Sequence, residues 1–190
     1  MGLSSSILEL AGRLISRPLG SGHASPSRKV KVPLVSIRPM TETEFKAFLA
    51  QDIHEYAAEK VRAGNWTPDE ALQRSREAHD KLLPEGLATP NHHLFTIELD
   101  VQPVGRLWLS SDPKTSGGAG FIYDLYVAEP FRRKGIARRA LVLLEQDTIR
   151  LGLTSLALHV FGHNTAARAL YESLGYSITN VNMAKTLPAA

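Results

Sequence analysis

Residues 132–137 lie between an apolar run and a helical pattern, and this order constrains the fold more than any other feature of the chain. The apolar run, residues 121–127, predicts a buried strand, and residues 138–150 place apolar side chains at helical spacing. A strand that turns through Gly135 directly into a helix gathers unpaired backbone N–H groups at the positive end of the helix dipole. The sequence therefore predicts a phosphate-binding turn at this point.

Positive charge is concentrated at the same turn. Gly135 allows a ligand to approach the backbone closely, and Ala137 is nearly as small. Cations at a helix N-terminus oppose the helix dipole, so a merely solvated basic helix start is disfavoured and a strongly anionic ligand is expected. Five cations lie within eight residues of one another: Arg132, Arg133, Lys134, Arg138 and Arg139.

The composition fits one globular domain and excludes several chemistries. Of 190 residues, 43% are hydrophobic and 22% are charged, as in ordinary globular proteins, and no apolar run is long enough to span a membrane. Without cysteine the chain has no disulfide, thiolate nucleophile or cysteine metal site, which suits a reducing compartment such as the cytoplasm. The adjacent His92 and His93 would face opposite ways on a strand, and no zinc motif occurs, so we expect no bound metal.

The distribution of charge disfavours a nucleic-acid-binding function. Residues 1–31 carry five cations against the single anion Glu9, a net charge of +4. Since the whole chain has a net charge of +3, the remaining 159 residues carry −1. A nucleic-acid-binding protein usually spreads a basic stripe over one face. In this chain the cations of the body are concentrated at the phosphate turn instead.

The first 32 residues differ in composition from the rest, and we expect a flexible N-terminal extension at 1–32 before a catalytic domain at 33–190. The extension is rich in serine and glycine, with Pro18 and Pro26 as helix breakers. A short amphipathic helix within it, with Arg13 and Arg17 on its polar side, is compatible with organelle targeting. Gly2, followed by a serine at position 6, also matches a myristoylation pattern. Both patterns are met easily by chance.

The body of the chain alternates strand and helix patterns. Thr41 and Glu44 form a capping box, and Thr67 followed by Pro68 begins a second helix. The resulting order predicts an α/β sandwich of helices around a mixed sheet. The expected elements are a strand at 34–38, two helices after Thr41 and Thr67, an antiparallel hairpin of strands at 94–99 and 104–109, a loop at 110–120, the strand and helix on either side of the turn, a strand at 155–160, a helix at 165–174 and one or two strands at 178–187.

A second block of residues combines helical spacing with a glycine-aromatic turn: Asn164, Ala167, Leu170, Tyr171, Leu174, Gly175 and Tyr176. Together with the Arg-x-x-Gly-x-Ala turn, this block resembles the acyl-CoA signature and closing helix of the GNAT N-acetyltransferase superfamily. The resemblance spans roughly residues 35–187 and is sharp at 121–176. Many members have glycine at the position of Ala137, and the family pattern allows either residue.

The resemblance implies a fold, a co-substrate and the residues that bind it. The fold is a central mixed, mostly antiparallel twisted sheet flanked by helices, which opens between the strands at 121–127 and 155–160. The co-substrate is acetyl-CoA, whose pantetheine arm would pair with the main chain of Leu125 and Val127 in the manner of an added strand. The N–H group of Val127 would polarise the thioester carbonyl. The expected co-substrate-binding residues are Leu125, Val127, Arg132, Arg133, Lys134, Gly135, Ile136, Ala137, Arg138, Asn164, Ala167 and Tyr171.

Two residues are candidates for proton transfer. Tyr171 stands two helical turns beyond Asn164 on the same face and would donate a proton to the leaving thiolate. The alternative is that Asn164 only caps the helix and Tyr171 is a core aromatic. Asp124 lies in an apolar strand, on the face that alternation assigns to Ile122 and Tyr126, where lost hydration would raise its pKa and suit it as the base. The alternatives are a structural carboxylate held by a salt bridge, and deprotonation of the amine through water.

We therefore expect an acetyl-CoA-dependent N-acetyltransferase that transfers an acetyl group to a primary amine by direct attack in a ternary complex. A non-catalytic acyl-CoA sensor of the same fold and a protein-binding domain without co-substrate are the alternatives. The partners are then acetyl-CoA and an amine acceptor, with neither nucleic acid nor membrane, and a homodimer is left open. We expect the two early helices and the loop at 110–120 to form the wall on the amine side.

Overall fold

The computed structural model of the chain describes residues 33–112, 118–183 and 185. The proposed extension at 1–32, with its targeting and myristoylation patterns, lies outside these residues, as does the middle of the loop at 110–120. The fold is therefore that of the body of the chain.

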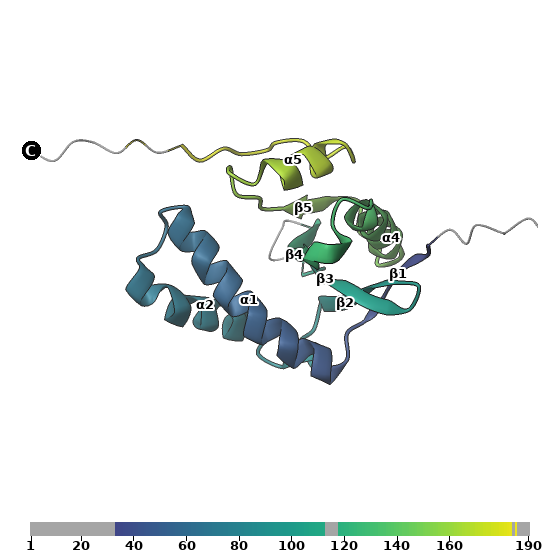
Figure 1. Cartoon of the computed structure of the whole chain (residues 1–190), viewed down its shortest axis with the longest axis horizontal. Helices are drawn as coiled ribbons and strands as arrows, with labels where there is room; N and C mark the ends of the chain where they lie inside the picture. The colour runs from purple at the N-terminus through teal and green to yellow at the C-terminus, as the bar shows by residue number, and fades with distance from the viewer. Residues whose placement is uncertain (1–32, 113–117, 184, 186–190) are drawn as a thin grey trace, which may run out of the picture. The chain divides into compact units, whose positions relative to one another are not determined.

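The described residues form a mixed sheet with helices on both faces, as the sequence predicts (Figure 1). The strand order is β1-β2-β3-β4-β5, in which the first four strands are antiparallel and β5 runs parallel to β4. The elements are β1 (Val35–Pro39), α1 (Glu42–Arg62), α2 (Pro68–Leu82), η1 (Gly86–Ala88), β2 (His92–Leu99), β3 (Gln102–Ser110), β4 (Gly120–Val127), η2 (Glu129–Phe131), α4 (Ile136–Arg150), β5 (Leu156–Leu158) and α5 (Thr165–Glu172).

Local sequence signals determine where α1 and α2 begin. At the start of α1, Glu44 N–H donates to the Thr41 hydroxyl and the Glu44 carboxylate accepts from Thr41 N–H at 2.8 Å, so the predicted capping box is present. At the start of α2, Glu70 accepts from Thr67 N–H at 3.0 Å, and proline occupies the first turn. These bonds satisfy backbone donors that have no partner within the helix.

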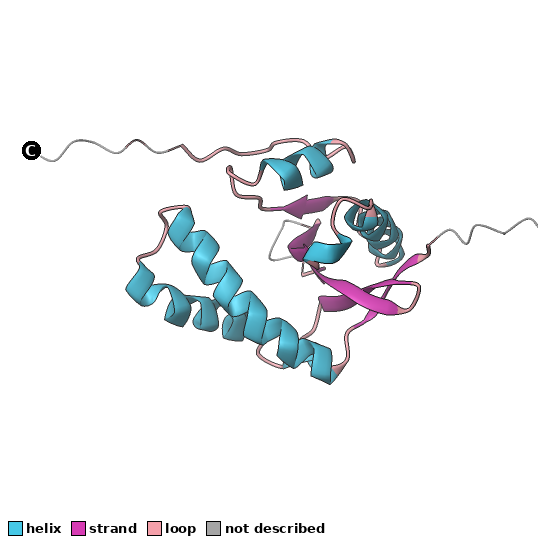
Figure 2. Cartoon of the chain, in the orientation of Figure 1, coloured by secondary structure: helices cyan, strands magenta, loops and turns pink. Residues whose placement is uncertain are grey.

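The two faces of the sheet are covered by different helices (Figure 2). Side chains of α4, including Leu141 and Leu144, pack with Leu107 and Leu109 of β3 in one core. On the opposite face Phe48 of α1 packs with Trp108 in a second core. Alternation along β3 separates the two sets of side chains, because successive residues of a strand point to opposite faces. The segment that carries Asp124 is therefore placed between two helical layers.

A β-bulge interrupts the alternation along β4. Trp108 pairs with Asp124 but Leu109 pairs with Ile122, so Tyr123 is an extra residue in β4. Ile122 packs in the α4 core, whereas Asp124 contacts Arg106 on the other face, towards α1. The expectation that Asp124 shares a face with Ile122 is therefore wrong, because it assumed unbroken alternation. The bulge turns the carboxylate towards the early helices.

The C-terminal part of the sheet is smaller than predicted. The strand expected at 155–160 is confirmed only as Leu156–Leu158. The one or two strands expected at 178–187 are wrong for the described residues 178–183 and 185, which form no strand. Ile178, Val181 and Met183 are exposed, by 59%, 65% and 92%. An alternating pattern yields a strand only when a neighbour covers one face, and these apolar side chains have no such cover among the described residues.

Candidate active site

The turn before α4 has the geometry expected of an anion site. Gly135 is the N-cap of α4 and adopts the left-handed conformation, with φ of 75°, which glycine tolerates without strain. It has no side chain to cap the helix, so the first N–H groups of α4 keep no intrahelical or capping partner. A Cβ atom on Gly135 would meet no protein atom within 4 Å. Open space in front of unpaired donors fits the pyrophosphate of a CoA thioester.

Several basic side chains of the turn bind backbone carbonyl groups. Arg132 Nε donates to Val127 O at 2.8 Å, Lys134 Nζ to Pro130 O at 2.9 Å, and Arg139 to Pro33 O at 3.1 Å. Arg138 donates to the Ser173 hydroxyl and thereby joins the start of α4 to the end of α5. We infer that these side chains hold the turn in shape, while its backbone N–H groups face the anion.

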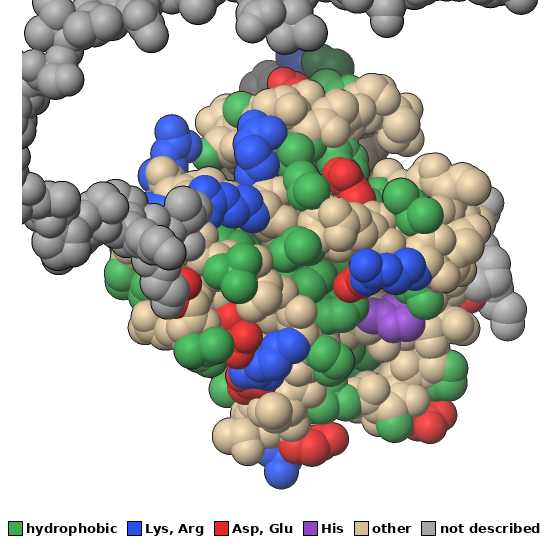
Figure 3. Space-filling view, turned by 90° about the vertical axis from the view of Figure 1, so that its right-hand side faces the viewer, with side chains coloured by type: hydrophobic (Ala, Val, Ile, Leu, Met, Phe, Trp, Pro, Cys, Tyr) green, Lys and Arg blue, Asp and Glu red, His purple; other side chains and the backbone are tan. Residues whose placement is uncertain are grey.

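The surface charge agrees with an anion site that is local. On the face seen in Figure 3, Lys and Arg side chains are interspersed with acidic and hydrophobic ones and form no continuous basic stripe. This is the arrangement that the charge count of the body leads one to expect.

The sheet opens beside the turn. β5 pairs with β4 only from Gly120 to Ile122, so the later part of β4 has no strand on that side among the described residues. Ala128 N–H donates to Val104 O, and alternation along the ladder then directs the N–H and C=O groups of Leu125 and Val127 away from β3. These groups face what we call the β4–β5 gap, the side of β4 beyond Ile122 that β5 does not pair. The opening implied by the resemblance is present.

The segment before α5 has the cap that the sequence suggested as an alternative. Asn164 Oδ1 accepts from Ala167 N–H at 3.1 Å, so Asn164 is the N-cap of α5. The residue is exposed, and its amide nitrogen is not needed for the cap. Capping therefore accounts for an asparagine at this position, and binding of the co-substrate arm by Asn164 and Ala167 stays a prediction.

Tyr171 is a half-buried residue of α5 that lines a pocket beside β5. Its ring packs on the α4 core and lies 5.5 Å from the Tyr176 ring. Burial and the negative charge of Asp124 raise the pKa of Tyr171 to about 12, so its hydroxyl stays protonated at physiological pH. The phenol is therefore available as a proton donor.

Asp124 is held by an arginine that three carboxylates share. Arg106 Nε donates to Asp124 Oδ2 at 2.7 Å, and Arg106 Nη2 donates to Glu55 at 2.7 Å and to Asp52 at 3.1 Å. Burial raises the pKa of Asp124 to about 7, with a further contribution from the Asp52 charge, while Arg106 opposes the rise. The salt-bridge alternative for Asp124 is thus present, and the carboxyl still titrates in the range that suits a base.

A histidine of α2 completes this cluster. His79, whose side chain is only 5% exposed, binds Asp52 Oδ2 through Nε2 at 2.8 Å and Ser75 O through Nδ1 at 2.8 Å. Burial lowers the pKa of His79, but the bonds to Asp52 and to the Ser75 carbonyl raise it by more, and the net shift is upward. The rings of His79 and Tyr56 also touch edge to face.

The sequence analysis missed Arg106, Asp52, Glu55 and His79. The signal for Arg106 was a cation between apolar residues of a predicted strand, since a buried guanidinium requires a carboxylate partner. Asp52 and Glu55 stand three residues apart on one helix, which places them on one face. Their partners are 51 and 54 residues away in the sequence, so no local pattern links them.

Two further titratable side chains near these elements have structural partners. Glu98 accepts from Arg38 Nε at 2.8 Å, which joins β1 to β2. His163 binds Glu59 of α1 at 2.6 Å and stacks on Phe161. Among the described residues no group of three His, Asp or Glu side chains could hold a metal ion, and no helix there is long and apolar enough to span a membrane.

A helix-flanked sheet that opens beside a glycine turn at the start of a helix is the architecture expected of an acyl-CoA-dependent transferase. The chain belongs to the Acetyltransferase (GNAT) family, whose profile matches residues 54–176. It is thus an acetyltransferase of a family that uses acetyl-CoA as co-substrate. The identification suggested by the two sequence blocks is confirmed.

Similar proteins agree with this assignment. The chain is 42% identical over 154 residues to "Uncharacterized N-acetyltransferase YycN" of Bacillus subtilis (strain 168), covering 80% of this chain and 99% of that protein. The crystal structure of YycN superposes with a TM-score of 0.78, covering 82% of this chain and all of that one. YdgE of the same organism is 39% identical over 153 residues, 80% of this chain and 98% of its own length. AAC(6')-Iy, in complex with a CoA bisubstrate analogue, shares the fold at 17% identity, with a TM-score of 0.52 over 82% of this chain and 99% of that chain.

Proposed function

We propose that the enzyme transfers the acetyl group of acetyl-CoA to a primary amine by direct attack in a ternary complex. The observation that carries the proposal is the position of Asp124. The bulge at Tyr123 turns this carboxylate towards α1, three residues before the main-chain donor Val127, and its charge reaches Tyr171 of α5. Under this proposal a base, a carbonyl donor and an acid act together at the β4–β5 gap.

The binding of acetyl-CoA is assigned to backbone groups. The N–H groups that follow Gly135 would hold the pyrophosphate, with Arg132 to Arg138 as its cationic surroundings. The main chain of Leu125 and Val127 would pair with the amides of the pantetheine arm, because these groups point into the β4–β5 gap. Both contacts rest on main-chain geometry, so they depend on the conformation of the turn and of β4 more than on particular side chains.

The chemical roles follow from the charges of the side chains. The amine enters from the side of α1 and α2, which Asp124 faces, and gives one proton to the Asp124 carboxylate. Its nitrogen forms a bond to the thioester carbon while Val127 N–H donates to the carbonyl oxygen. The carbon–sulfur bond breaks, and Tyr171, protonated because its pKa is about 12, gives its proton to the sulfur. An amine that enters as an ammonium ion has two protons to lose: Asp124 releases the first to solvent, and the second leaves the nitrogen after the attack and returns through solvent to Tyr171, which restores both groups.

The test is an activity screen. Purified full-length enzyme is mixed with acetyl-CoA and a panel of primary amines, and thiol release is followed with a thiol reagent, alongside product mass. We expect thiol release that depends on one class of amine and a product heavier than that amine by one acetyl group. Thiol release without acetylated amine would mean hydrolysis, and acetyl-CoA binding without turnover across a broad panel would favour the sensor. A double-reciprocal plot with parallel lines would instead indicate an acetyl-enzyme and contradict direct attack.

A further inference from the structure

The buried side chains behind Asp124 alternate in charge. Asp124 binds Arg106 at 2.7 Å, Arg106 binds Asp52 at 3.1 Å, and Asp52 binds His79 at 2.8 Å. We call Asp124, Arg106, Asp52 and His79 the ion-pair chain. It runs from β4 through β3 and α1 to α2, and only its first member faces the proposed reaction.

The hydrogen bonds of His79, the last member of the ion-pair chain, determine its charge. Both partners of His79, the Ser75 carbonyl and the Asp52 carboxylate, can only accept hydrogen bonds. Each ring nitrogen of His79 must therefore donate, which requires the doubly protonated imidazolium. The positive charge of His79 offsets the negative charge of Asp52. Asp52 therefore cancels less of the electrostatic effect of Arg106 on Asp124.

The charged surroundings of Asp124 come from five elements. Helix α1 contributes Asp52 and Glu55, α2 contributes His79, and β3 contributes Arg106, which also lies 4.3 Å from the centre of the Tyr126 ring on β4. Helix α5 contributes the neutral Tyr171. Three carboxylates thus face one guanidinium and one imidazolium, so the cluster is one positive charge short when every carboxyl is ionised.

The bonding of Asp124 is one-sided. Its Oδ2 accepts from Arg106, while Oδ1 makes no hydrogen bond to any residue that the structure describes. The Arg106 side chain is only 8% exposed and is fixed by three carboxylates, so it holds Asp124 in one orientation. Oδ1 is then the oxygen left to accept a proton.

We propose that Arg106, Asp52 and His79 are positioning residues, which fix Oδ2 of Asp124 and set, through their alternating charges, the pH range in which Oδ1 accepts the proton of the amine. The inference rests on the proposed function, because it takes Asp124 as the base. Under it, the charge of Asp52 holds the proton on Asp124, and the charge of His79 counteracts Asp52. The alternative is that the ion-pair chain has only a structural role and holds α1 and α2 against the sheet.

Removing either charge distinguishes these readings, because the two effects have opposite signs. Asp52→Asn removes a negative charge next to Arg106, and its amide can still hydrogen bond both neighbours, so Asp124 should ionise at lower pH. His79 then becomes neutral, but it lies farther from Asp124 than Asp52 does. His79→Gln leaves the Asp52 charge without its offset, so Asp124 should ionise at higher pH. We expect shifts of about one pH unit in each direction.

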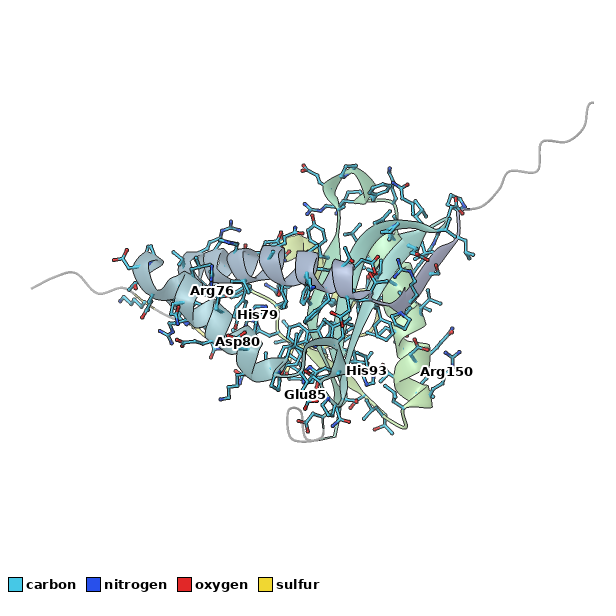
Figure 4. The ribbon with its side chains drawn as sticks, turned by 90° about the horizontal axis from the view of Figure 1, so that it is seen from below. Arg76, His79, Asp80, Glu85, His93 and Arg150 are labelled. Atoms are coloured by element: carbon cyan, nitrogen blue, oxygen red, sulfur yellow. The ribbon has the colours of Figure 1, made fainter. Side chains whose placement is uncertain are left out.

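A matched control and a double variant complete the set. Asp80→Asn removes the same charge from the next residue of α2, where the side chain is exposed (Figure 4), and should shift nothing. The double variant Asp52→Asn/His79→Gln should match Asp52→Asn, because His79 is already neutral once Asp52 carries no charge. Thermal melting of each variant shows which of them are folded, and Asp52→Asn alone decides the question if His79→Gln does not fold.

Two readouts separate this inference from the proposed function. The first is carbon-13 NMR of the side-chain carboxyl groups in the free enzyme, with the Asp124 signal assigned by its loss in Asp124→Asn. The second is the pH dependence of kcat/KM with acetyl-CoA and an amine that the screen accepts. Opposite shifts of about one pH unit in both readouts support the inference. If the Asp124 titration shifts but the pH dependence of kcat/KM does not, the ion-pair chain sets the pKa of Asp124, and the assignment of Asp124 as the base is wrong. If the Asp124 titration is unchanged, or moves the same way in both single variants, the inference is overturned.

Discussion

A Cβ atom on Gly105 would lie 2.3 Å from the carbonyl oxygen of Tyr126. The two residues belong to β3 and β4, and Gly105 pairs with Val127, whose N–H faces the β4–β5 gap. The absence of a side chain at position 105 thus lets β4 approach β3 closely at the point where the proposed carbonyl donor stands.

Gly105→Ala should therefore weaken both folding and co-substrate binding. Real Cβ contacts do not occur at 2.3 Å, so the backbone of β4 must move, at a cost of about 1–3 kcal/mol in unfolding free energy. We expect a lower denaturation midpoint and a weaker Kd for acetyl-CoA by calorimetry. Gly162→Ala is the control, because a Cβ atom there has no neighbour within 4 Å. An unchanged Kd in folded Gly105→Ala would show that binding does not depend on the position of Val127.

Gly135→Val tests the phosphate turn. The added side chain meets no protein atom within 4 Å but enters the space assigned to the pyrophosphate, so acetyl-CoA affinity should fall by about tenfold or more. Backbone strain must be separated from this effect, since φ is 75°. Gly152→Val supplies the comparison, because Gly152 has φ of 79° and open space beyond the other end of α4. Equal losses of affinity in the two variants would point to strain alone.

Tyr171→Phe tests the general acid. The ring and its packing remain, so stability and acetyl-CoA affinity should change little, while turnover should fall by about 100-fold under conditions where chemistry limits the rate. Tyr176→Phe is a matched control, since its ring lies 5.5 Å from Tyr171 and its buried hydroxyl has no partner among the described residues. That control should keep full turnover and gain slight stability. Wild-type turnover in Tyr171→Phe would exclude Tyr171 as the acid.

The raised pKa of Asp124 predicts how kcat/KM depends on pH. Only the ionised carboxyl accepts a proton, and burial raises the pKa of Asp124 to about 7, so kcat/KM should increase as pH rises through about 7. Asp124→Asn should lose the transition near pH 7, and at higher pH its rate should rise towards the wild-type plateau because the amine then arrives already deprotonated. Initial rates between pH 5.5 and 9 (roughly two units around that pKa) test this. A wild-type-like profile in Asp124→Asn would assign deprotonation to water.

The parts of the fold that the sequence predicts are those set by neighbours in the chain. The capping box at Thr41, the helix start at Thr67, the hairpin between β2 and β3 and the turn at Gly135 each depend on a few consecutive residues. Local hydrogen bonds and backbone conformation decide such features, so one segment carries the whole signal. The two halves of the acetyl-CoA signature could be found for the same reason.

Features that depend on distant partners escaped prediction. The bulge at Tyr123 is visible only in the register between β3 and β4, and it reverses the face on which Asp124 lies relative to Ile122. The sharing of Arg106 by three carboxylates requires α1, β3 and β4 to be in place. The segment expected to form one or two C-terminal strands contains apolar residues, but a pattern of side chains does not supply the neighbour that a strand needs.

The limited pairing between β4 and β5 has a consequence for amide hydrogen exchange. In the free enzyme the N–H groups of Leu125 and Val127 have no strand partner within the part of the chain that the structure describes, whereas the N–H group of Tyr126, between them, points towards β3. Exchange rates along this stretch should therefore alternate from residue to residue, fast at Leu125 and Val127 and slow at Tyr126. Saturating acetyl-CoA should slow the two fast positions to the rate of their neighbour and erase the alternation. One strand of the protein would thus record, residue by residue, whether the co-substrate is bound.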